Sequence, residues 1–169
     1  AVAAAQPADA IVVLTAVSSA ATYGHFAQAE PPHTQLALTG GAIGEGMAMA
    51  LGAAIAAPGR RVINLEADGS GAYILQALWS QARSRVPVTT VICANRRYRI
   101  LETEQERAGV RPGRIAAELT RLDDPALDWV GLAGAMGVPG EQVLDEAGLA
   151  QALRRGLAEP GPYLIEALM

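Results

Sequence analysis

The segment "RVINLEADGSGAYILQALW" (residues 61–79) joins a strand-like half to a helix-like half, and one carboxylate, Asp68, stands at the junction. The first half is apolar and β-branched, as in a strand covered on both faces. The second half places apolar residues at helical spacing and predicts a helix over 72–84, with Ile74, Leu75, Leu78 and Trp79 on one face. Such a junction offers free N–H groups and the positive end of a helix dipole to an anion. Because Asp68 alone would repel an anion, the arrangement predicts a cation between the two.

The same alternation of short strands and longer helices runs along most of the chain. Strands are expected at 10–14, 61–67, 86–94, 141–144 and 162–169. Helices are expected at 18–29, 45–57, 72–84, 128–137 and 146–160. Residues 31–46 resemble a loop, and residues 95–128 resemble a helical turn followed by a mobile loop. The pattern predicts an α/β fold: a doubly wound, mainly parallel sheet of about six strands with helices on both faces.

Composition narrows the class of protein. At 169 residues and 51% hydrophobic content, residues 1–169 are expected to form a single domain with a full core. No apolar run is long enough to span a bilayer, and the start lacks a signal-peptide pattern, so we expect a cytoplasmic protein with no membrane partner. A net charge of −4, with no lysine, argues against a nucleic-acid partner. The single cysteine, Cys93, lies in an apolar run typical of a buried thiol.

Polar residues follow three of the expected strands. Ser18 and Ser19 follow the first, Asp68 follows the strand at 61–67, and Asn95 follows the strand at 86–94. Asp68 and Asn95 are separated by one helix and one strand, so they are expected at the same edge of the sheet. Carboxylate, amide and phosphate oxygens are the ligands that Mg²⁺ or Ca²⁺ prefers. The alternative is that Asp68 is only a helix N-cap and Asn95 only a turn residue.

These residues resemble the pyrophosphate-binding domain of the thiamine-diphosphate-dependent enzymes. The family motif is Gly-Asp-Gly followed, somewhat under thirty residues later, by Asn or a doubled Asn; this chain has "ADGS" at 67–70 and "ANRRY" at 94–98. The resemblance extends from "IVVLTAVSS" to "PGPYLIEAL" and is closest to the branch of benzoylformate decarboxylase and acetolactate synthase. Ala67 and Ala94 replace a motif Gly and a motif Asn, neither of which is a metal ligand in the family.

The resemblance implies a site for thiamine diphosphate and Mg²⁺. Asp68 and Asn95 would ligate the metal through their side chains, and Arg97 through its backbone carbonyl. The residues expected to hold the diphosphate are Gly69 and Ser70 on one side and Ser18 and Ser19 on the other.

The resemblance also implies contacts to the organic part of the cofactor and to the substrate. The carbonyl of Gly41 would accept a hydrogen bond from the 4′-amino group, and Ile43 would hold the cofactor in its bent shape. Ile100 and Leu101 resemble positions that line the substrate pocket. The sequence assigns no role to Glu45, and it favours a solvating role for Arg96, Arg97 and Arg99 over attraction of an anionic substrate.

The function implied is decarboxylation of a 2-oxo acid, a small-molecule substrate, or carboligation of the product to an acceptor, as in acetolactate synthase or benzoylformate decarboxylase. In the family an activating glutamate comes from a separate pyrimidine-binding domain, usually on another subunit of a homo-oligomer (dimer or tetramer). No segment of this chain resembles that domain. We therefore expect a C-terminal part of a longer chain, which the missing initiator Met favours; the alternatives are one subunit of a split enzyme and a non-catalytic assembly or regulatory module.

Overall fold

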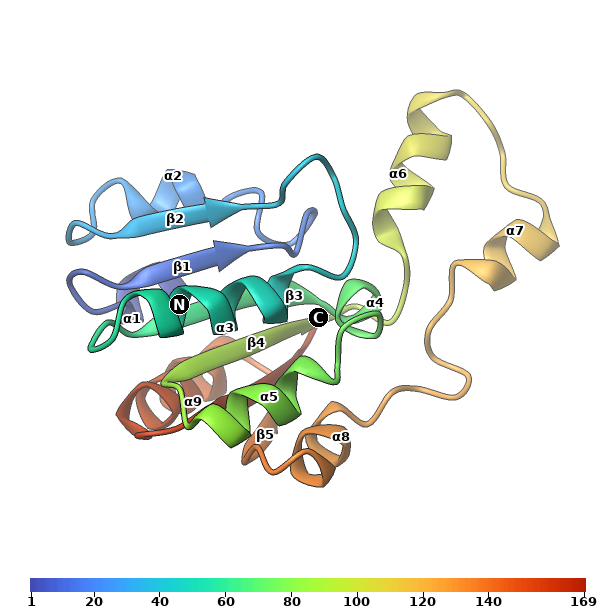
Figure 1. The fold of residues 1–169 in the computed structure, drawn as a ribbon. Coiled ribbons are helices and arrows are strands. Elements are labelled where there is room, and N and C mark those ends of the chain that lie inside the picture. Colours follow the sequence, from blue (N-terminus) through green and yellow to red (C-terminus); the bar gives the residue numbers. More distant parts are fainter.

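The computed structural model describes all residues from 1 to 169, and its centre is one six-stranded sheet (Figure 1). The strands are β1 (Ile11–Leu14), β2 (Thr34–Ala37), β3 (Val62–Ala67), β4 (Val88–Ala94), β5 (Gly140–Val143) and β6 (Tyr163–Leu168). Their order across the sheet is β2-β1-β3-β4-β6-β5, and every neighbouring pair is parallel. The doubly wound α/β fold and the count of about six strands are confirmed.

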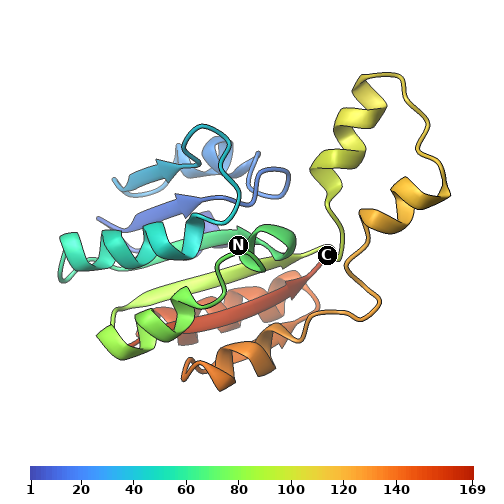
Figure 2. The same ribbon diagram turned by 45° about the vertical axis from the view of Figure 1, so that its right-hand side comes forward.

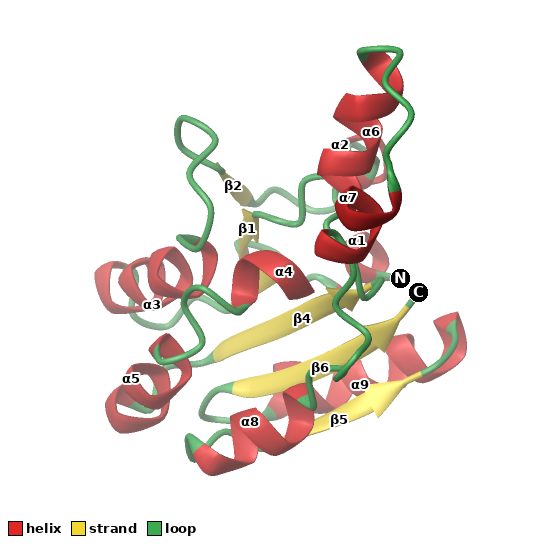
Figure 3. Cartoon of the chain, turned by 90° about the vertical axis from the view of Figure 1, so that its right-hand side faces the viewer, coloured by secondary structure: helices red, strands yellow, loops and turns green.

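Helices cover both faces of the sheet, as the turned views show (Figures 2 and 3). One face carries α1 (Val2–Ala5), α2 (Tyr23–Ala27) and α9 (Glu146–Ala158). The opposite face carries α3 (Gly46–Ala56), α5 (Ala77–Ser84) and α8 (Trp129–Ala135). The short α4 (Asp68–Gly71) follows β3 directly, while α6 (Arg99–Arg107) and α7 (Arg114–Leu119) project from the carboxyl edge of the sheet. No helix is long and apolar enough to cross a membrane.

The central strands are buried on both sides, which explains their nearly continuous apolar sequence. All seven residues of β4 are buried, and so are the first five of β3. Cys93 lies in this layer and is buried, as its apolar surroundings predict. Burial of this double-sided core is the main source of the free energy that holds the strand ends in place.

The strand order reverses direction between β1 and β3. After β1 the chain passes to β2 at one edge, and it then returns to place β3 on the other side of β1. At such a switch point the loops after two adjacent strands diverge to opposite faces and leave a crevice at the carboxyl edge. The loop after β1 and α4 after β3 border this crevice, and β4 with Asn95 lies next to them.

Two expectations in the first third of the chain are wrong. The segment 31–46, interpreted as a loop, contains β2, a four-residue edge strand. Its exposed residues give almost no apolar alternation, so its pairing with β1 could not be recognised locally. The helix expected over 18–29 is confined to α2, preceded by turns, and the short α1 was not expected at all.

The helix expected over 72–84 is also interrupted. Turns occupy 72–76, and only α5 is regular helix. Leu78 is fully buried on the expected face, whereas Trp79 is 50% exposed and carries the guanidinium of Arg83 at 5.3 Å from its ring centroid. Within 95–128, where a turn and a loop were expected, the structure has α6 and α7, neither of which buries a residue.

Two helical glycines provide a matched test of how tightly the layers pack. A Cβ added to Gly156 in α9 would lie 2.9 Å from Thr89 Cγ2 and 3.0 Å from the ring of Tyr163, whereas one added to Gly52 in α3 would meet nothing within 4 Å. We expect Gly156→Ala to lower the free energy of unfolding by about 1–3 kcal/mol through overpacking. Gly52→Ala should raise it by about 0.5–1 kcal/mol through helix propensity. Urea unfolding of both variants measures the difference, and an equal effect of the two would contradict the packing at Gly156.

Candidate functional site

A cavity of about 350 Å³ opens at the carboxyl ends of β1, β3 and β4, in the crevice at the switch point. Its volume is within the range of small-molecule sites. Nine of the residues singled out in the sequence line it: Ser18, Gly41, Ile43, Asp68, Gly69, Ser70, Asn95, Arg97 and Ile100. Residues from four separate segments of the chain are therefore brought to one cavity.

Asp68 joins the two halves of the motif. Its side chain is buried, its Oδ1 accepts a hydrogen bond from the N–H of Gly69 at 2.8 Å, and its Oδ2 accepts one from the N–H of Arg96 at 2.6 Å. Burial raises the pKa of Asp68 above its usual range, and the two N–H donors oppose that rise because they favour the carboxylate. Arg96 has φ of +57°, a left-handed conformation that is uncommon outside glycine and marks a constrained turn.

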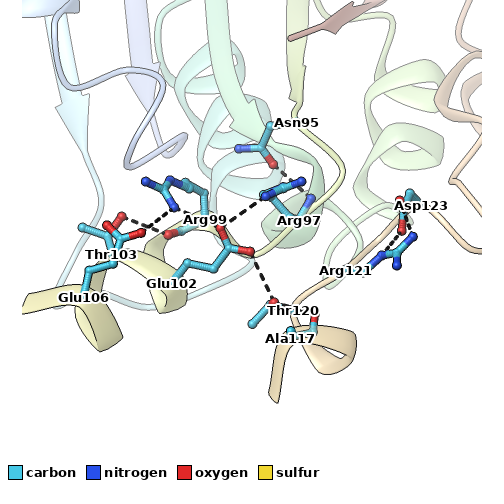
Figure 4. A network of polar contacts seen from close by, with 10 residues as sticks. All are labelled: Asn95, Arg97, Arg99, Glu102, Thr103, Glu106, Ala117, Thr120, Arg121 and Asp123. Carbon is cyan, nitrogen blue, oxygen red and sulfur yellow. Dashed lines mark hydrogen bonds and ion pairs between the residues drawn. The ribbon is translucent and has the colours of Figure 1, made fainter. Parts of the chain in front are cut away.

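Asn95 and Arg97 form the other half of the site (Figure 4). Asn95 Oδ1 accepts a hydrogen bond from the N–H of Arg97 at 3.1 Å, so Asn95 does form the turn that the simpler interpretation predicts. No backbone N–H donates to the carbonyl oxygen of Arg97, which leaves that oxygen without a backbone partner. A carboxylate, an amide and a carbonyl beside an open cavity are a donor set that fits Mg²⁺ completed by phosphate oxygens.

The chain has no cluster of three or more His, Cys, Asp or Glu residues that could hold a metal. The oxygen donors next to the cavity therefore do not by themselves form a complete metal cage. A cation there would depend on oxygens supplied by a ligand, because Asp68 provides the only carboxylate in the lining.

The loop between β2 and α3 forms the opposite wall of the cavity. Gly40, Gly41 and Gly44 have positive φ, and the side chain of Ile43 lines the cavity while 51% exposed. Glu45, for which the sequence predicts no role, accepts a hydrogen bond through Oε1 from the N–H of Thr39 and so closes this loop. The loop contributes two bulky apolar residues, Leu38 and Ile43, and the small residues Gly41 and Ala42 to the lining of the cavity.

Two of the residues expected in the site do not line this cavity. Ser19 follows Ser18 directly but lines a second cavity, of about 420 Å³, on the face of the sheet that carries α1, α2 and α9. Leu101 lies on α6, is 50% exposed and lines neither of these cavities. Their expected roles are therefore not supported by their positions in this structure.

The structure adds Thr15 and Tyr98 to the lining, and the sequence analysis missed both. The Tyr98 ring covers Gly69: a Cβ at Gly69 would lie 2.5 Å from Tyr98 Cε1. Their positions in the sequence were the only indication of a role in the site, since Thr15 is the first residue after β1 and Tyr98 follows Asn95 by three residues. Neither signal is specific without knowledge of which strand ends are neighbours.

The arginines beyond Asn95 are held mainly by acidic neighbours on α6. Arg99 Nη1 lies 3.1 Å from Glu102 Oε2 and 3.1 Å from Glu106 Oε1, and Arg97 Nη1 lies 3.5 Å from Glu102 Oε2 (Figure 4). Exposed pairs of this kind are worth only about 0–1 kcal/mol each. They support the interpretation that these side chains mainly solvate the loop, although Arg97 and Arg99 also border the cavity.

Comparison with known proteins places this site in a family. The model of the thiamine pyrophosphate enzyme C-terminal TPP-binding domain matches residues 16–167. The chain is 49% identical over 141 residues to IlvX of Mycobacterium tuberculosis, which is named as an acetolactate synthase large subunit, covering 82% of this chain and 27% of that protein. It is 34% identical over 160 residues to benzoylformate decarboxylase of Pseudomonas aeruginosa, covering 95% of this chain and 29% of that enzyme.

A solved structure is similar to this chain over nearly its whole length. The thiamine diphosphate-dependent 4-hydroxybenzoylformate decarboxylase of Rhodococcus jostii RHA1 superposes with a TM-score of 0.82 at 33% identity, covering 99% of this chain and 31% of that one. The chain thus spans less than a third of the length of these relatives. The family model covers the Asp68 and Asn95 segments and five of the six strands, β6 short of its last residue, and begins just after β1. This chain therefore belongs to the thiamine pyrophosphate enzymes and matches their C-terminal TPP-binding domain.

Proposed function

We propose that this chain binds thiamine diphosphate together with Mg²⁺ as the cofactor-binding part of a 2-oxo acid decarboxylase or carboligase. The observation that carries the proposal is the hydrogen bond from the N–H of Arg96 to Asp68 Oδ2, at 2.6 Å. It joins the ends of β3 and β4 so that one carboxylate and one amide border the same cavity. That arrangement suits a divalent cation bridging protein oxygens and a diphosphate.

Each site residue expected from the sequence that lines the cavity has a definite part in this proposal. Asp68, Asn95 and the Arg97 carbonyl hold the metal, and the residues that hold the diphosphate are Ser18, Gly69 and Ser70. Gly41 offers its carbonyl to the aminopyrimidine, and Ile43 supports the bend that brings the amino group near the reacting carbon. Ile100 borders the place of the substrate. When bound, the cofactor supplies stabilisation of the carbanion that forms as CO₂ departs.

The activity further requires residues that this chain does not carry in the cavity. The lining has no carboxylate besides Asp68, so the activating glutamate is assigned to a pyrimidine-binding domain, on the same polypeptide or on a partner subunit. We propose the residues 1–169 as one domain of such a homo-oligomeric assembly, acting on a small 2-oxo acid in the cytoplasm. The names of the relatives, acetolactate synthase and benzoylformate decarboxylase, support this substrate class.

Removal of the Asp68 carboxylate tests the metal and diphosphate site. In the assembly of this chain with its pyrimidine-binding domain, Asp68→Ala should weaken binding of thiamine diphosphate with Mg²⁺ by about 100-fold or more, because the cation loses its only carboxylate ligand. Isothermal titration calorimetry measures this affinity. Asp9→Ala is the matched control, since Asp9 is an exposed carboxylate paired only with Arg60 at the other edge.

Two results would count against the proposal. One is the absence of thiamine diphosphate binding by the wild-type assembly at millimolar cofactor and Mg²⁺. That result would favour a non-catalytic module that keeps the fold for assembly alone. The other is an unchanged affinity in Asp68→Ala, which would remove the metal-binding role from Asp68.

Shortening the apolar side chain in the loop after β2 tests the role of Ile43. Ile43→Ala should lower kcat by about 10-fold or more while changing cofactor affinity by less than about 3-fold, because the side chain orients the cofactor and does not anchor its charged end. Steady-state kinetics with benzoylformate and pyruvate, together with cofactor titration, separates the two quantities. Ile55→Ala is the control, since Ile55 is similarly exposed but lies on α3 outside the cavity. Equal effects of the two variants would remove this role from Ile43.

A further inference from the structure

A second carboxylate lies directly behind the cavity and has no part in the proposed chemistry. Glu66, two residues before Asp68 on β3, is fully buried at 0% exposure. It stands on the face of the sheet that carries α3 and α5, in register with Ile92 of β4. Full burial of a carboxylate costs free energy unless the group is paired and hydrogen-bonded.

The side chain of Glu66 meets three segments of the chain at once. Its Oε1 accepts a hydrogen bond from the hydroxyl of Ser70 on α4. Its Oε2 approaches Gly46, the first residue of α3, so closely that a Cβ there would lie 2.1 Å from this oxygen. The same point is 2.2 Å from Thr15 Oγ1, so both side chains lie close to Gly46, while the Thr15 hydroxyl donates a hydrogen bond to the carbonyl of Leu65 at 3.1 Å.

Each of these three segments leads directly into the wall of the cavity. Thr15 begins the turn that carries Ser18, Gly46 ends the loop that carries Gly41 and Ile43, and Ser70 lies in α4 beside Asp68. None of the three segments has a direct side-chain hydrogen bond to either of the others. The Glu66 carboxylate accepts a hydrogen bond from Ser70 and lies beside Gly46 and Thr15. Glycine at position 46 leaves the space that the carboxylate occupies.

One oxygen of Glu66 lacks a partner, which indicates that this side chain positions the cavity walls and does not add to the stability of the fold. Glu66 Oε2 is buried and has no hydrogen-bond partner. Replacement of a buried, incompletely paired carboxylate by an apolar residue of similar volume is often neutral or stabilising. The buried oxygen of Glu66 therefore offers no clear gain in stability, and its place beside the cavity walls suggests a role in their arrangement.

We infer that Glu66 is a positioning residue. Its carboxylate fixes the relative positions of three segments, namely the turn after β1, α4 and the first residue of α3, so that the three walls of the cofactor cavity are formed before the cofactor arrives. The identity of the bound group rests on the proposed function. The positioning itself is a property of the cofactor-free chain. The hydrogen bond from Ser70 and the position of Glu66 beside Gly46 and Thr15 exist without a ligand.

Three variants test the inference in the assembly of this chain with its pyrimidine-binding domain. Glu66→Leu removes the carboxylate and should raise the Kd of thiamine diphosphate with Mg²⁺ by about 10-fold or more. Glu66→Gln keeps an oxygen for the Ser70 hydroxyl and should restore Kd to within about 3-fold of wild type. Thr90→Val, the control, deletes another buried and unpartnered polar group on the same face of the sheet, away from the cavity, and should leave Kd unchanged.

A cofactor-free readout separates this inference from the proposed function. Amide hydrogen exchange in Glu66→Leu should be at least about 10-fold faster in residues 39–46 and 68–71 than in wild type, with exchange in α9 unchanged. This difference is expected even if thiamine diphosphate does not bind, in which case the proposed function fails and the positioning role stands. The melting temperature of Glu66→Leu should not fall, which distinguishes positioning from general destabilisation.

The inference is overturned if Glu66→Leu binds the cofactor like wild type with unchanged exchange, or if Glu66→Gln loses as much affinity as Glu66→Leu. If Glu66→Leu does not fold, Gly46→Ala tests the same role of Glu66, because the added methyl group displaces the carboxylate without removing it. Gly46→Ala should then raise Kd by about 10-fold and speed exchange in 39–46. Wild-type values for both quantities would contradict the role of Glu66.

Discussion

The carboxylate of Asp68 is the contact on which the site depends. It accepts hydrogen bonds from the N–H of Gly69 and from the N–H of Arg96, two groups that follow different strands. Through the second bond the turn at Asn95 is held against the end of β3, with Arg96 in a left-handed conformation. Charge-assisted bonds to backbone N–H groups are among the strongest in proteins, so this one side chain fixes the geometry of both motif halves.

The buried sheet makes that contact possible. β3 and β4 are covered on both faces and paired in register from Val62 with Val88 to Ala67 with Cys93, which places the next residues of both strands at one edge. The reversal of strand order between β1 and β3 then opens the crevice beside them. The same packing explains why polar groups behind the crevice, Glu66 above all, can be held without direct access to solvent.

The helices that project from the carboxyl edge of the sheet pack much less tightly than the buried strands. The projecting α6 and α7 bury no residue and are held by ion pairs such as Arg114 with Glu118, which contribute little to stability. The chain spans less than a third of the length of its relatives. A rigid core with a weakly held rim is consistent with a domain that completes its site with residues from elsewhere.

The sequence by itself determined the fold class and the pairing of Asp68 with Asn95. A strand-helix-strand interval of 27 residues returns the chain to the same sheet edge, whatever the details of packing. Only the tertiary structure decided what depends on neighbours distant in sequence. It placed Ser18 in the cofactor cavity and Ser19 in the second cavity, left Leu101 outside both, revealed β2 as an edge strand and brought Glu66 close to Gly46. The reason is physical: periodicity along one segment says which residues share a face, whereas strand order and side-chain packing decide what that face meets.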